Sequence, residues 1–239
     1  MKRVLYVYAM TNDSGFAPCI KDDLLSLACC KGGKNGGMRK AIAQDFFNSE
    51  NEVWVLGLCG KGLAANNTQM IYNPVYFARI DNVIEMTKYF EFGNEYSERS
   101  DHKAYKTING ELESQPENPH TEKSEQTKDK NGKFVLLSNR FVYWGEKCGE
   151  SGSELKVLYP AIFKGDGNKQ GIEQHYRGYL VDRDFECNIE SDLAKFNWFP
   201  SDGKCNIITT KSISGEYVYF EDEDCEDEHK ICLSCGGKK

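Results

Sequence analysis

Short runs of apolar and aromatic residues, separated by polar turns, recur along most of the chain. Such runs are typical of buried strands, because β-branched and aromatic side chains pack well on a pleated sheet. One run contains Pro74, which indicates an edge strand or a bulge, since proline donates no hydrogen bond to the ladder. The runs predict strands at residues 4–9, 53–58, 71–80, 134–138 and 141–144.

Helical patterns are fewer and shorter than the strand-like runs. Leucines at helical spacing predict one or two helical turns at residues 22–30, and short helices are expected at 39–48 and 84–90. Residues 93–133 are mostly polar. Polar segments of this length are usually functional or disordered, so we expect a long, mobile polar excursion whose first half docks on the body.

The order of these elements favours one fold class. Short strands outnumber helices and do not alternate regularly with them. This order is typical of an α+β protein with a curved, mainly antiparallel sheet rather than a doubly wound parallel sheet. The 239 residues are enough for one full core, so residues 1–239 are expected to form a single domain.

The charge of the chain is concentrated near its end. Acidic residues outnumber basic ones by 37 to 30, which gives a formal net charge of −7. Seven of the acids lie in residues 221–228 (EDEDCEDE), so the rest of the chain is formally neutral. This balance excludes a globally basic nucleic-acid coat and a uniformly acidic solubiliser. The acidic tail at residues 221–239 is a candidate surface for a protein partner.

The ten cysteines, together with the absence of a secretion signal, indicate the redox compartment of the protein. No apolar stretch approaches the roughly 18 residues that a membrane span needs. The apolar run at residues 4–10 is short and lacks the features of a secretion signal. We therefore expect mostly reduced thiols in a cytoplasmic protein without a membrane span.

The tail contains a candidate metal site. Cys225, His229, Cys232 and Cys235 have the spacing C-x3-H-x2-C-x2-C. Thiolate and imidazole are ligands that zinc prefers, and C-x2-C is a usual half-site. Four ligands this close leave little chain to wrap the ion, so a solvated, thiol-containing tail without metal is the alternative.

The turn after the first predicted strand, TNDSGFAPC at residues 11–19, carries the first candidate ligand groups. Asp13 is a candidate general base, ligand or turn former. Gly15 allows the backbone to approach a ligand closely, and Phe16 suits stacking on a planar base. An ordinary tight turn is the alternative.

A basic, glycine-rich loop follows. Residues 31–40 (KGGKNGGMRK) hold four glycines and four basic residues. Such loops hold phosphates through backbone N–H groups and charge, although neither GxxxxGK[ST] nor GxGxxG is present. A lysine beside a thiol favours a reactive thiolate, so Cys30 is a candidate nucleophile, with Lys31 and Arg39 as phosphate ligands. A flexible loop beside buried thiols is the alternative.

A third group lies at residues 138–145, at and just before the last predicted strand. Ser138, Tyr143 and Trp144 surround Arg140, and aromatics next to an arginine suit base stacking with a phosphate contact. Alternating aromatics in a strand also suit a core.

The histidines carry no motif of a known hydrolase or deaminase. They are His102, His120, His175 and His229. The signatures GxSxG, HExxH and HxE…PCxxC are absent from the sequence. A Ser–His–Asp triad stays open, because its members occur in any chain order.

Four segments in order are similar to the nucleotide modification associated domain family, second type. TNDSGFAP at 11–18, LACCK at 27–31 and Arg39 resemble its T-x-D-x-GFAP, TLA-x-CKP and arginine. VWVLGLCGKG resembles its GDWIIGTG-like strand and turn, and the likeness continues through MIYNPVYFARIDNVIEMTKYF. VLLSNRFVYWG resembles VLIS-x-x-F-x-YFG. Gly32 stands where the family has proline, and residues 32–37 look like an insertion.

The resemblance, which covers about residues 4–145, implies a bacterial or phage protein linked to modification of nucleotides or DNA bases. The pattern at residues 53–90 also resembles small barrels of the PUA, ASCH and EVE type, which bind modified bases. A small barrel is therefore an alternative to the open curved sheet. The implied partner is a nucleotide or nucleic acid, including a modified base.

Two kinds of function follow from these observations. The first is a nucleotide- or base-handling protein with a pocket built from residues 11–18, 29–40 and 138–145. In an enzyme, Asp13 is the general base or Cys30 the nucleophile. In a non-enzymatic reader, the same cations position phosphate and the aromatics stack the base. The second kind is a protein-interaction module of a phage-defence system.

Overall fold

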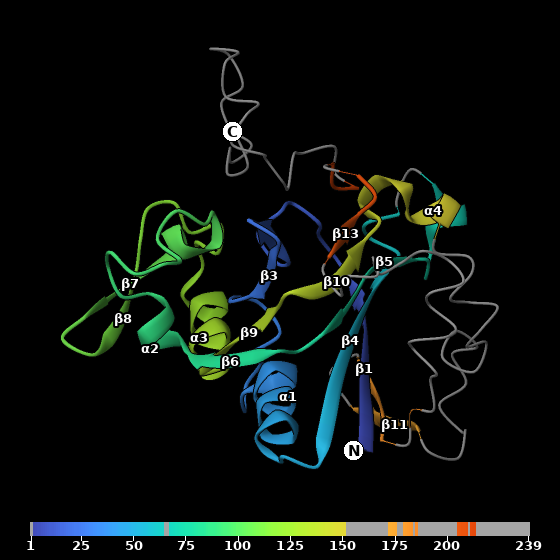
Figure 1. The fold of residues 1–239 in the computed structure, drawn as a ribbon. Helices are drawn as coiled ribbons and strands as arrows, with labels where there is room; N and C mark the ends of the chain where they lie inside the picture. Colours follow the sequence, from blue (N-terminus) through green and yellow to red (C-terminus); the bar gives the residue numbers. More distant parts are fainter. Residues whose placement is uncertain are drawn as a thin grey trace.

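A mixed sheet of seven strands forms one side of the protein in the computed structural model (Figure 1). The structure describes residues 2–64, 67–151, 172–175, 179–183, 185, 205–209 and 211–213. The strand order is β11-β12-β1-β4-β5-β10-β13. The strands are β1 (Lys2–Met10), β4 (Asn51–Cys59), β5 (Pro74–Arg79), β10 (Arg140–Tyr143), β11 (Ile172–His175), β12 (Tyr179–Asp182) and β13 (Asn206–Ile207).

The centre of this sheet is a parallel pair, β1 and β4, in which Val4 lies opposite Val53. Every residue from Val53 to Cys59 is buried. An apolar run without alternation is typical of a strand covered on both faces, which explains why the sequence predicts these strands well. The strand that begins at Pro74 also agrees with its prediction, because the register shifts at Gly57 and Leu58 opposite it.

A second sheet has the order β2-β3-β9-β6 and is antiparallel throughout. Its strands are β2 (Cys19–Lys21), β3 (Leu24–Leu27), β6 (Asn82–Glu85) and β9 (Phe134–Ser138). The helical turns expected at residues 22–30 are wrong. Asp22 and Asp23 have φ of 52° and 57°, the left-handed values of a two-residue hairpin turn, and they return the chain as β3.

Short helices surround the two sheets. Helix α1 buries Met38, Ile42 and Ala43, and it occupies most of the predicted helix at residues 39–48. The predicted helix at 84–90 is divided between β6 and α2. The helices are α1 (Gly37–Phe47), α2 (Met86–Tyr89), α3 (Lys123–Asn131) and α4 (Cys148–Ser151), with 3-10 turns η1 (Thr68–Met70), η2 (Asp101–Ala104) and η3 (Gly145–Lys147).

The polar excursion at residues 93–133 carries regular structure. It contains η2, the hairpin of β7 (Tyr105–Ile108) and β8 (Glu111–Ser114), and α3. The hairpin extends away from β1 and β4 in Figure 1. The sequence signals these elements weakly, because α3 has a single buried residue, Asp129. The mobility expected for this segment stays a prediction.

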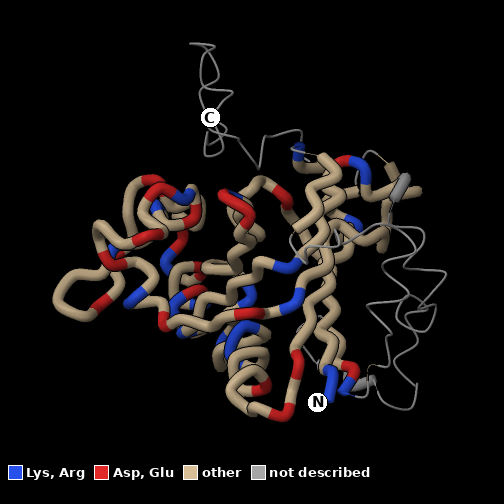
Figure 2. The backbone as a smooth tube through the Cα atoms, viewed as in Figure 1, with Lys and Arg blue, Asp and Glu red and all other residues tan. Residues whose placement is uncertain are grey.

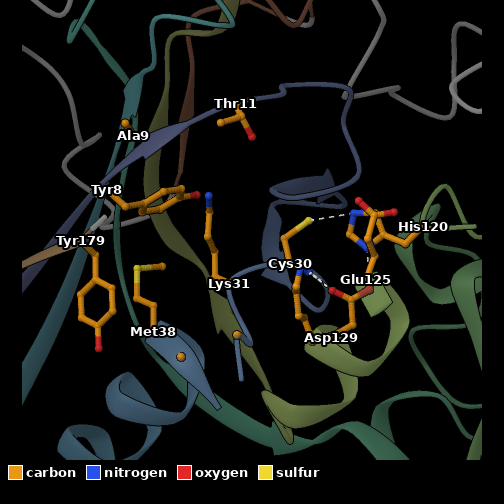
Figure 3. A pocket seen from close by; sticks show the side chains of 13 residues that line it. Tyr8, Ala9, Thr11, Cys30, Lys31, Met38, His120, Glu125, Asp129 and Tyr179 are labelled. Carbon is orange, nitrogen blue, oxygen red and sulfur yellow. Dashed lines mark hydrogen bonds and ion pairs between the residues drawn. The ribbon is translucent and has the colours of Figure 1, made fainter. Parts of the chain in front are cut away.

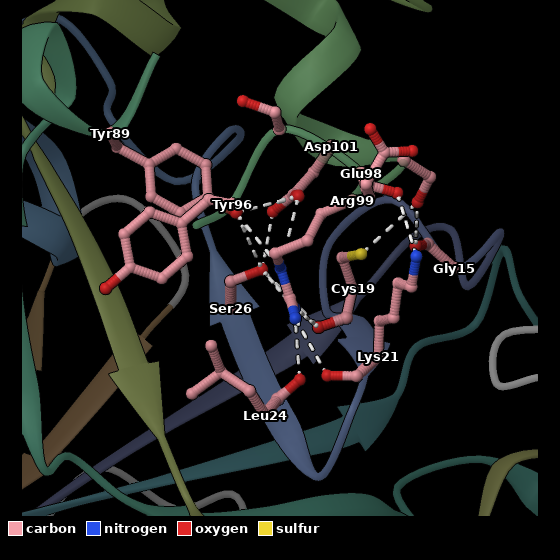
Figure 4. A network of polar contacts seen from close by, with 12 residues as sticks. Gly15, Cys19, Lys21, Leu24, Ser26, Tyr89, Tyr96, Glu98, Arg99 and Asp101 are labelled. Atoms are coloured by element: carbon pink, nitrogen blue, oxygen red, sulfur yellow. Dashed lines mark hydrogen bonds and ion pairs between the residues drawn. The ribbon is translucent and has the colours of Figure 1, made fainter. Parts of the chain in front are cut away.

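A buried polar network joins the excursion to the second sheet (Figure 4). Arg99 Nη2 donates to the Leu24 carbonyl at 3.0 Å and to Ser26 Oγ at 2.9 Å. Asp101 accepts from Ser26 Oγ at 2.5 Å and from the Tyr89 hydroxyl at 2.9 Å. Each buried charge is therefore satisfied by several partners, which is the condition for keeping a charge in the interior.

The α+β class and the mainly antiparallel, open-sheet architecture are confirmed. The described strands do not close into a barrel, so the barrel alternative is not the one adopted there. Among the described residues, no helix has the length and apolar character to cross a bilayer. Figure 2 shows acidic and basic residues interspersed along the described chain.

Candidate active site

A cavity of about 550 Å³ opens where β1 ends, between the start of α1 and α3 (Figure 3). Four separate parts of the chain form its walls: the end of β1, the glycine-rich loop, the excursion and Tyr179 of β12. Cavities of this size commonly hold a small molecule. Its lining residues include Tyr8, Thr11, Cys30, Lys31, His120 and Asp129.

Cys30 lies in the loop after β3 with its backbone in an uncommon conformation. Its φ is 60° and that of Lys31 is 52°, in the left-handed region that costs a non-glycine residue free energy. The backbone N–H of Cys30 donates to Asp129 Oδ1 at 2.7 Å. The neighbouring Cys29 is fully buried, and burial raises the pKa of its thiol well above the usual value. The two adjacent cysteines are therefore chemically different.

His120 links the thiol to a carboxylate. Its Nε2 lies 3.5 Å from Cys30 Sγ, and its Nδ1 lies 2.6 Å from Asp129 Oδ2. The hydrogen bond to Asp129 raises the pKa of His120 to about 10, with a smaller contribution from Cys30 and an opposing one from burial. A protonated imidazole beside a thiol is the environment in which cysteine reacts as a thiolate.

Asp129 lies at the end of this relay. Its side chain is about 1% exposed, and its Oδ2 also accepts from the Tyr105 hydroxyl at 3.0 Å. The sulfur, ring nitrogen and carboxylate atoms lie within 4.8 Å of one another, which is close enough for a shared metal ion. The carboxylate already accepts bonds from Cys30, Tyr105 and His120. The arrangement therefore fits a Cys–His–Asp relay better than a metal centre.

Arg39 contacts both ends of the relay, Cys30 and Asp129. Its side chain is fully buried, and its Nε donates to the Cys30 carbonyl at 2.8 Å. Its two terminal nitrogens donate to the carbonyls of Phe134 and Asp129. Sequence reasoning expects Arg39 to bind phosphate, whereas the structure engages all three nitrogens with backbone oxygens. It is therefore placed to position Cys30 and Asp129.

Lys31 supplies a positive charge to the cavity. Its Nζ lies 4.5 Å from the centre of the Tyr8 ring, and no carboxylate among the described residues pairs with it. Burial lowers the pKa of Lys31. Gly37 and Met38, at the start of α1, line the same wall, and no side chain caps that helix. A cation beside an uncapped helix N-terminus favours an anionic ligand.

A second, smaller chamber of about 170 Å³ adjoins the relay. Phe16 and Ala17 form part of its wall, and the Phe16 ring meets the His120 ring edge to face at 6.0 Å. Five residues line both chambers: Tyr8, Thr11, Cys30, Lys31 and His120.

The remaining candidates lie elsewhere. Asp13 is buried beside Tyr143, whose hydroxyl donates to its Oδ2 at 3.0 Å, and it lines neither chamber. Gly15 has φ of 74° and accepts a bond from Ser100. Ser138 and Trp144 are fully buried outside both chambers. The structure thus unites Phe16, Cys30, Lys31 and Arg39 and leaves the others outside this group.

Two residues of the relay escape sequence reasoning. His120 and Asp129 lie in the polar excursion, 90 and 99 positions from Cys30. A histidine and an aspartate nine positions apart are a weak signal in a segment rich in charged residues. The four metal-ligand candidates in the tail, Cys225, His229, Cys232 and Cys235, lie outside the described residues.

Comparison with known proteins gives one match. The family described as nucleotide modification associated domain 2 matches residues 1–177. No curated protein and no solved structure is detectably similar to the chain.

Proposed function

Because this chain belongs to the nucleotide modification associated domain 2 family, we propose that it is an enzyme acting on a phosphate-bearing nucleotide or nucleic-acid base. The observation that carries the proposal is the relay of Cys30, His120 and Asp129 at the wall of the large cavity. A nucleophile, an acid–base group and an orienting carboxylate in this order constitute the triad arrangement of acyl-transfer enzymes.

Each member of the relay has a defined role. Cys30 Sγ attacks an electrophilic carbon, His120 exchanges protons with the sulfur and the leaving group, and Asp129 holds the ring through Nδ1. His120 takes the general-base role for which Asp13 is also a sequence candidate. Asp13 Oδ2 accepts from Tyr143 and from the backbone N–H of Ile213, away from both chambers.

The phosphate is assigned to the wall formed by Lys31 and the start of α1. A partly buried lysine without a carboxylate partner loses hydration, and an anion that shares its environment compensates for that loss. The helix N-terminus adds backbone N–H donors and a partial positive charge. These two features support a phosphate-bearing ligand rather than a neutral one.

A bacterial or phage origin and a cytoplasmic setting complete the proposal. They are supported by the sequence resemblance and by Cys19, Cys29 and Cys30, which are free thiols.

The test uses 4-nitrophenyl acetate as an artificial acyl donor and the full, reduced chain. We expect a burst of one 4-nitrophenolate per chain and an acetyl group on Cys30 in the intact mass spectrum. His120→Gln should slow the burst about 100-fold or more, since general acid–base catalysis contributes at least that factor. Adenosine monophosphate should slow acetylation by occupying the large cavity.

The adjacent cysteine supplies the matched control. Cys29→Ser should keep the burst, whereas Cys30→Ser should lose it. Acetylation that persists in Cys30→Ser would overturn the assignment of the nucleophile. If adenosine monophosphate binds with equal affinity to Cys30→Ser and the natural chain, and neither shows a burst, the chain is a reader and the enzyme proposal fails.

A further inference from the structure

Cys30 and His120 are common to the linings of two chambers. Both residues line the chamber of about 550 Å³ and the chamber of about 170 Å³. In Figure 3 the sulfur points toward His120, while Lys31 rises beside it toward the Tyr8 ring. A group bonded to Sγ therefore has access to two spaces of different size.

The two chambers differ in chemistry. The large chamber adds Glu125, Lys128 and Asp129, which are charged, to the shared residues. The small chamber adds neutral residues, and every charged side chain that lines it also lines the large one. The residues added by the small chamber are Met10, Asn12, Ser14, Phe16, Ala17 and Pro119. The large chamber thus suits a charged ligand and the small one an uncharged group.

We propose that the small chamber is an acyl pocket, which holds the uncharged group that Cys30 takes up, while the phosphate-bearing part of the substrate occupies the large chamber. The inference rests on the proposed function. It specifies the substrate class: a nucleotide or base that carries a small, uncharged acyl group.

The covalent step is balanced by groups at the site. The thiolate of Cys30 attacks the acyl carbon, a C–S bond forms, and the bond from that carbon to the leaving oxygen or nitrogen breaks. The leaving atom keeps the electron pair and receives the proton of His120. Water or an amine then attacks the thioester, His120 accepts its proton, and the thiolate is restored.

The test compares the rates at which 4-nitrophenyl acetate and 4-nitrophenyl butyrate acylate Cys30 in the full chain. Ala17→Leu fills the small chamber, so it should lower the butyrate-to-acetate ratio about tenfold, as expected for overpacking a fitted pocket. Phe16→Leu enlarges the chamber and should raise the ratio. Opposite shifts in two folded variants cannot result from a general loss of stability.

Adenosine monophosphate separates this inference from the proposed function. Lys128→Gln changes the large chamber alone, so it should weaken protection of Cys30 by the nucleotide and leave the butyrate-to-acetate ratio unchanged. Ala17→Leu changes the small chamber alone, so it should lower the ratio and leave protection by the nucleotide unchanged. If protection by the nucleotide persists but Ala17→Leu leaves the ratio unchanged, the acyl pocket is refuted and the proposed function stands. If the nucleotide gives no protection to the natural chain, the proposed function itself is refuted.

Discussion

The guanidinium of Arg39 donates to the carbonyl oxygen of Cys30 across 2.8 Å and, through another nitrogen, to the carbonyl of Asp129. One side chain in α1 thereby fixes the two ends of a relay whose members come from distant parts of the chain. The left-handed backbone at Cys30 is tolerated because its N–H and its carbonyl both have strong partners.

Replacing Arg39 by lysine tests this positioning role. The planar fork of arginine reaches three carbonyls with three nitrogens, whereas the single ammonium nitrogen of the shorter lysine side chain cannot reach all of them. We expect Arg39→Lys to lower the free energy of unfolding by about 2–3 kcal/mol through buried carbonyls left unpaired. The acylation rate of Cys30 should fall about tenfold, as misplacement of a reacting group predicts.

A positioning role of Arg39 affects the acylation rate and nucleotide binding differently. Acylation at saturating 4-nitrophenyl acetate should slow, while half-maximal protection by adenosine monophosphate should occur at the same concentration. Equal loss of both would indicate general damage to the fold and contradict a positioning role.

Gly132→Ala is expected to disturb the same arginine by steric pressure. A Cβ at Gly132 would lie 2.3 Å from Arg39 Nη2. The φ of Gly132 is −63°, which any residue adopts, so space alone decides the outcome. We expect a loss of about 1–3 kcal/mol in unfolding free energy and slower acylation of Cys30.

Gly62→Ala is the matched control for Gly132, because a Cβ there meets nothing within 4 Å. Its effect on stability should stay within about 0.5 kcal/mol in urea denaturation. Equal stability of the two alanine variants would show that position 132 tolerates a side chain and that Arg39 is packed less tightly against Gly132 than inferred.

Much of the fold follows from the sequence, and part of the site does not. The strands at residues 4–9 and 53–58 are predictable because their apolar runs are buried on both faces. The expected helical turns at 22–30 fail because Asp22 and Asp23 form a tight turn that leucine spacing does not reveal. Local propensity is a weak guide where tertiary pairing decides.

The site was predictable only where its residues share one loop. Cys30 and Lys31 are adjacent in a basic, glycine-rich segment, and that composition already indicates reactive or anion-binding chemistry. His120 and Asp129 reach Cys30 through long-range contacts that no local pattern encodes. The sequence also does not reveal that Arg39 is buried, because its burial depends on the docking of the distant helix α3.

The Arg99 network should control how firmly the excursion is attached to the second sheet. Arg99→Met removes the donors to the Leu24 and Lys21 carbonyls and leaves Asp101 buried without its cation. Breaking a buried charged pair costs about 3–5 kcal/mol. We expect a stability loss of that order and faster amide hydrogen exchange at residues 94–105.

The control for Arg99 is Arg3→Met, which removes an arginine from a partly exposed pair with Glu52. Such a pair contributes about 0–1 kcal/mol, so this variant should unfold at nearly the natural denaturant concentration. Similar exchange rates at residues 94–105 in the two variants would refute the proposed attachment.

The zinc site predicted in the tail is tested by elemental analysis of the reduced chain. We expect about one zinc per chain if Cys225, His229, Cys232 and Cys235 form a closed tetrahedral site. Cys232→Ser should lose the metal, and Cys30→Ser should keep it, because the relay carboxylate is already engaged. Metal lost in Cys30→Ser but kept in Cys232→Ser would move the site to the cavity.

The relay should make the stability of the protein depend on pH through His120. The bond to Asp129 raises the pKa of His120 to about 10, whereas a histidine in an unfolded chain titrates near ~6.5. Since the folded state holds this proton more tightly, its contribution to the unfolding free energy is complete below about pH 6.5. It disappears as the pH rises through about 10.

His120→Gln isolates this contribution, because glutamine keeps a polar group at the position but does not titrate. The difference in unfolding free energy between the natural chain and His120→Gln should shrink by about 1–2 kcal/mol between pH 6.5 and 10. This is less than the full pKa shift implies, since the ring is partly exposed to solvent. Urea denaturation across this pH range measures it. Burial raises the pKa values of the Cys19 and Cys29 thiols in both chains alike, so their contributions cancel in this difference. A difference that stays constant with pH would mean that His120 is not held protonated by Asp129, and the relay would lose its acid–base member.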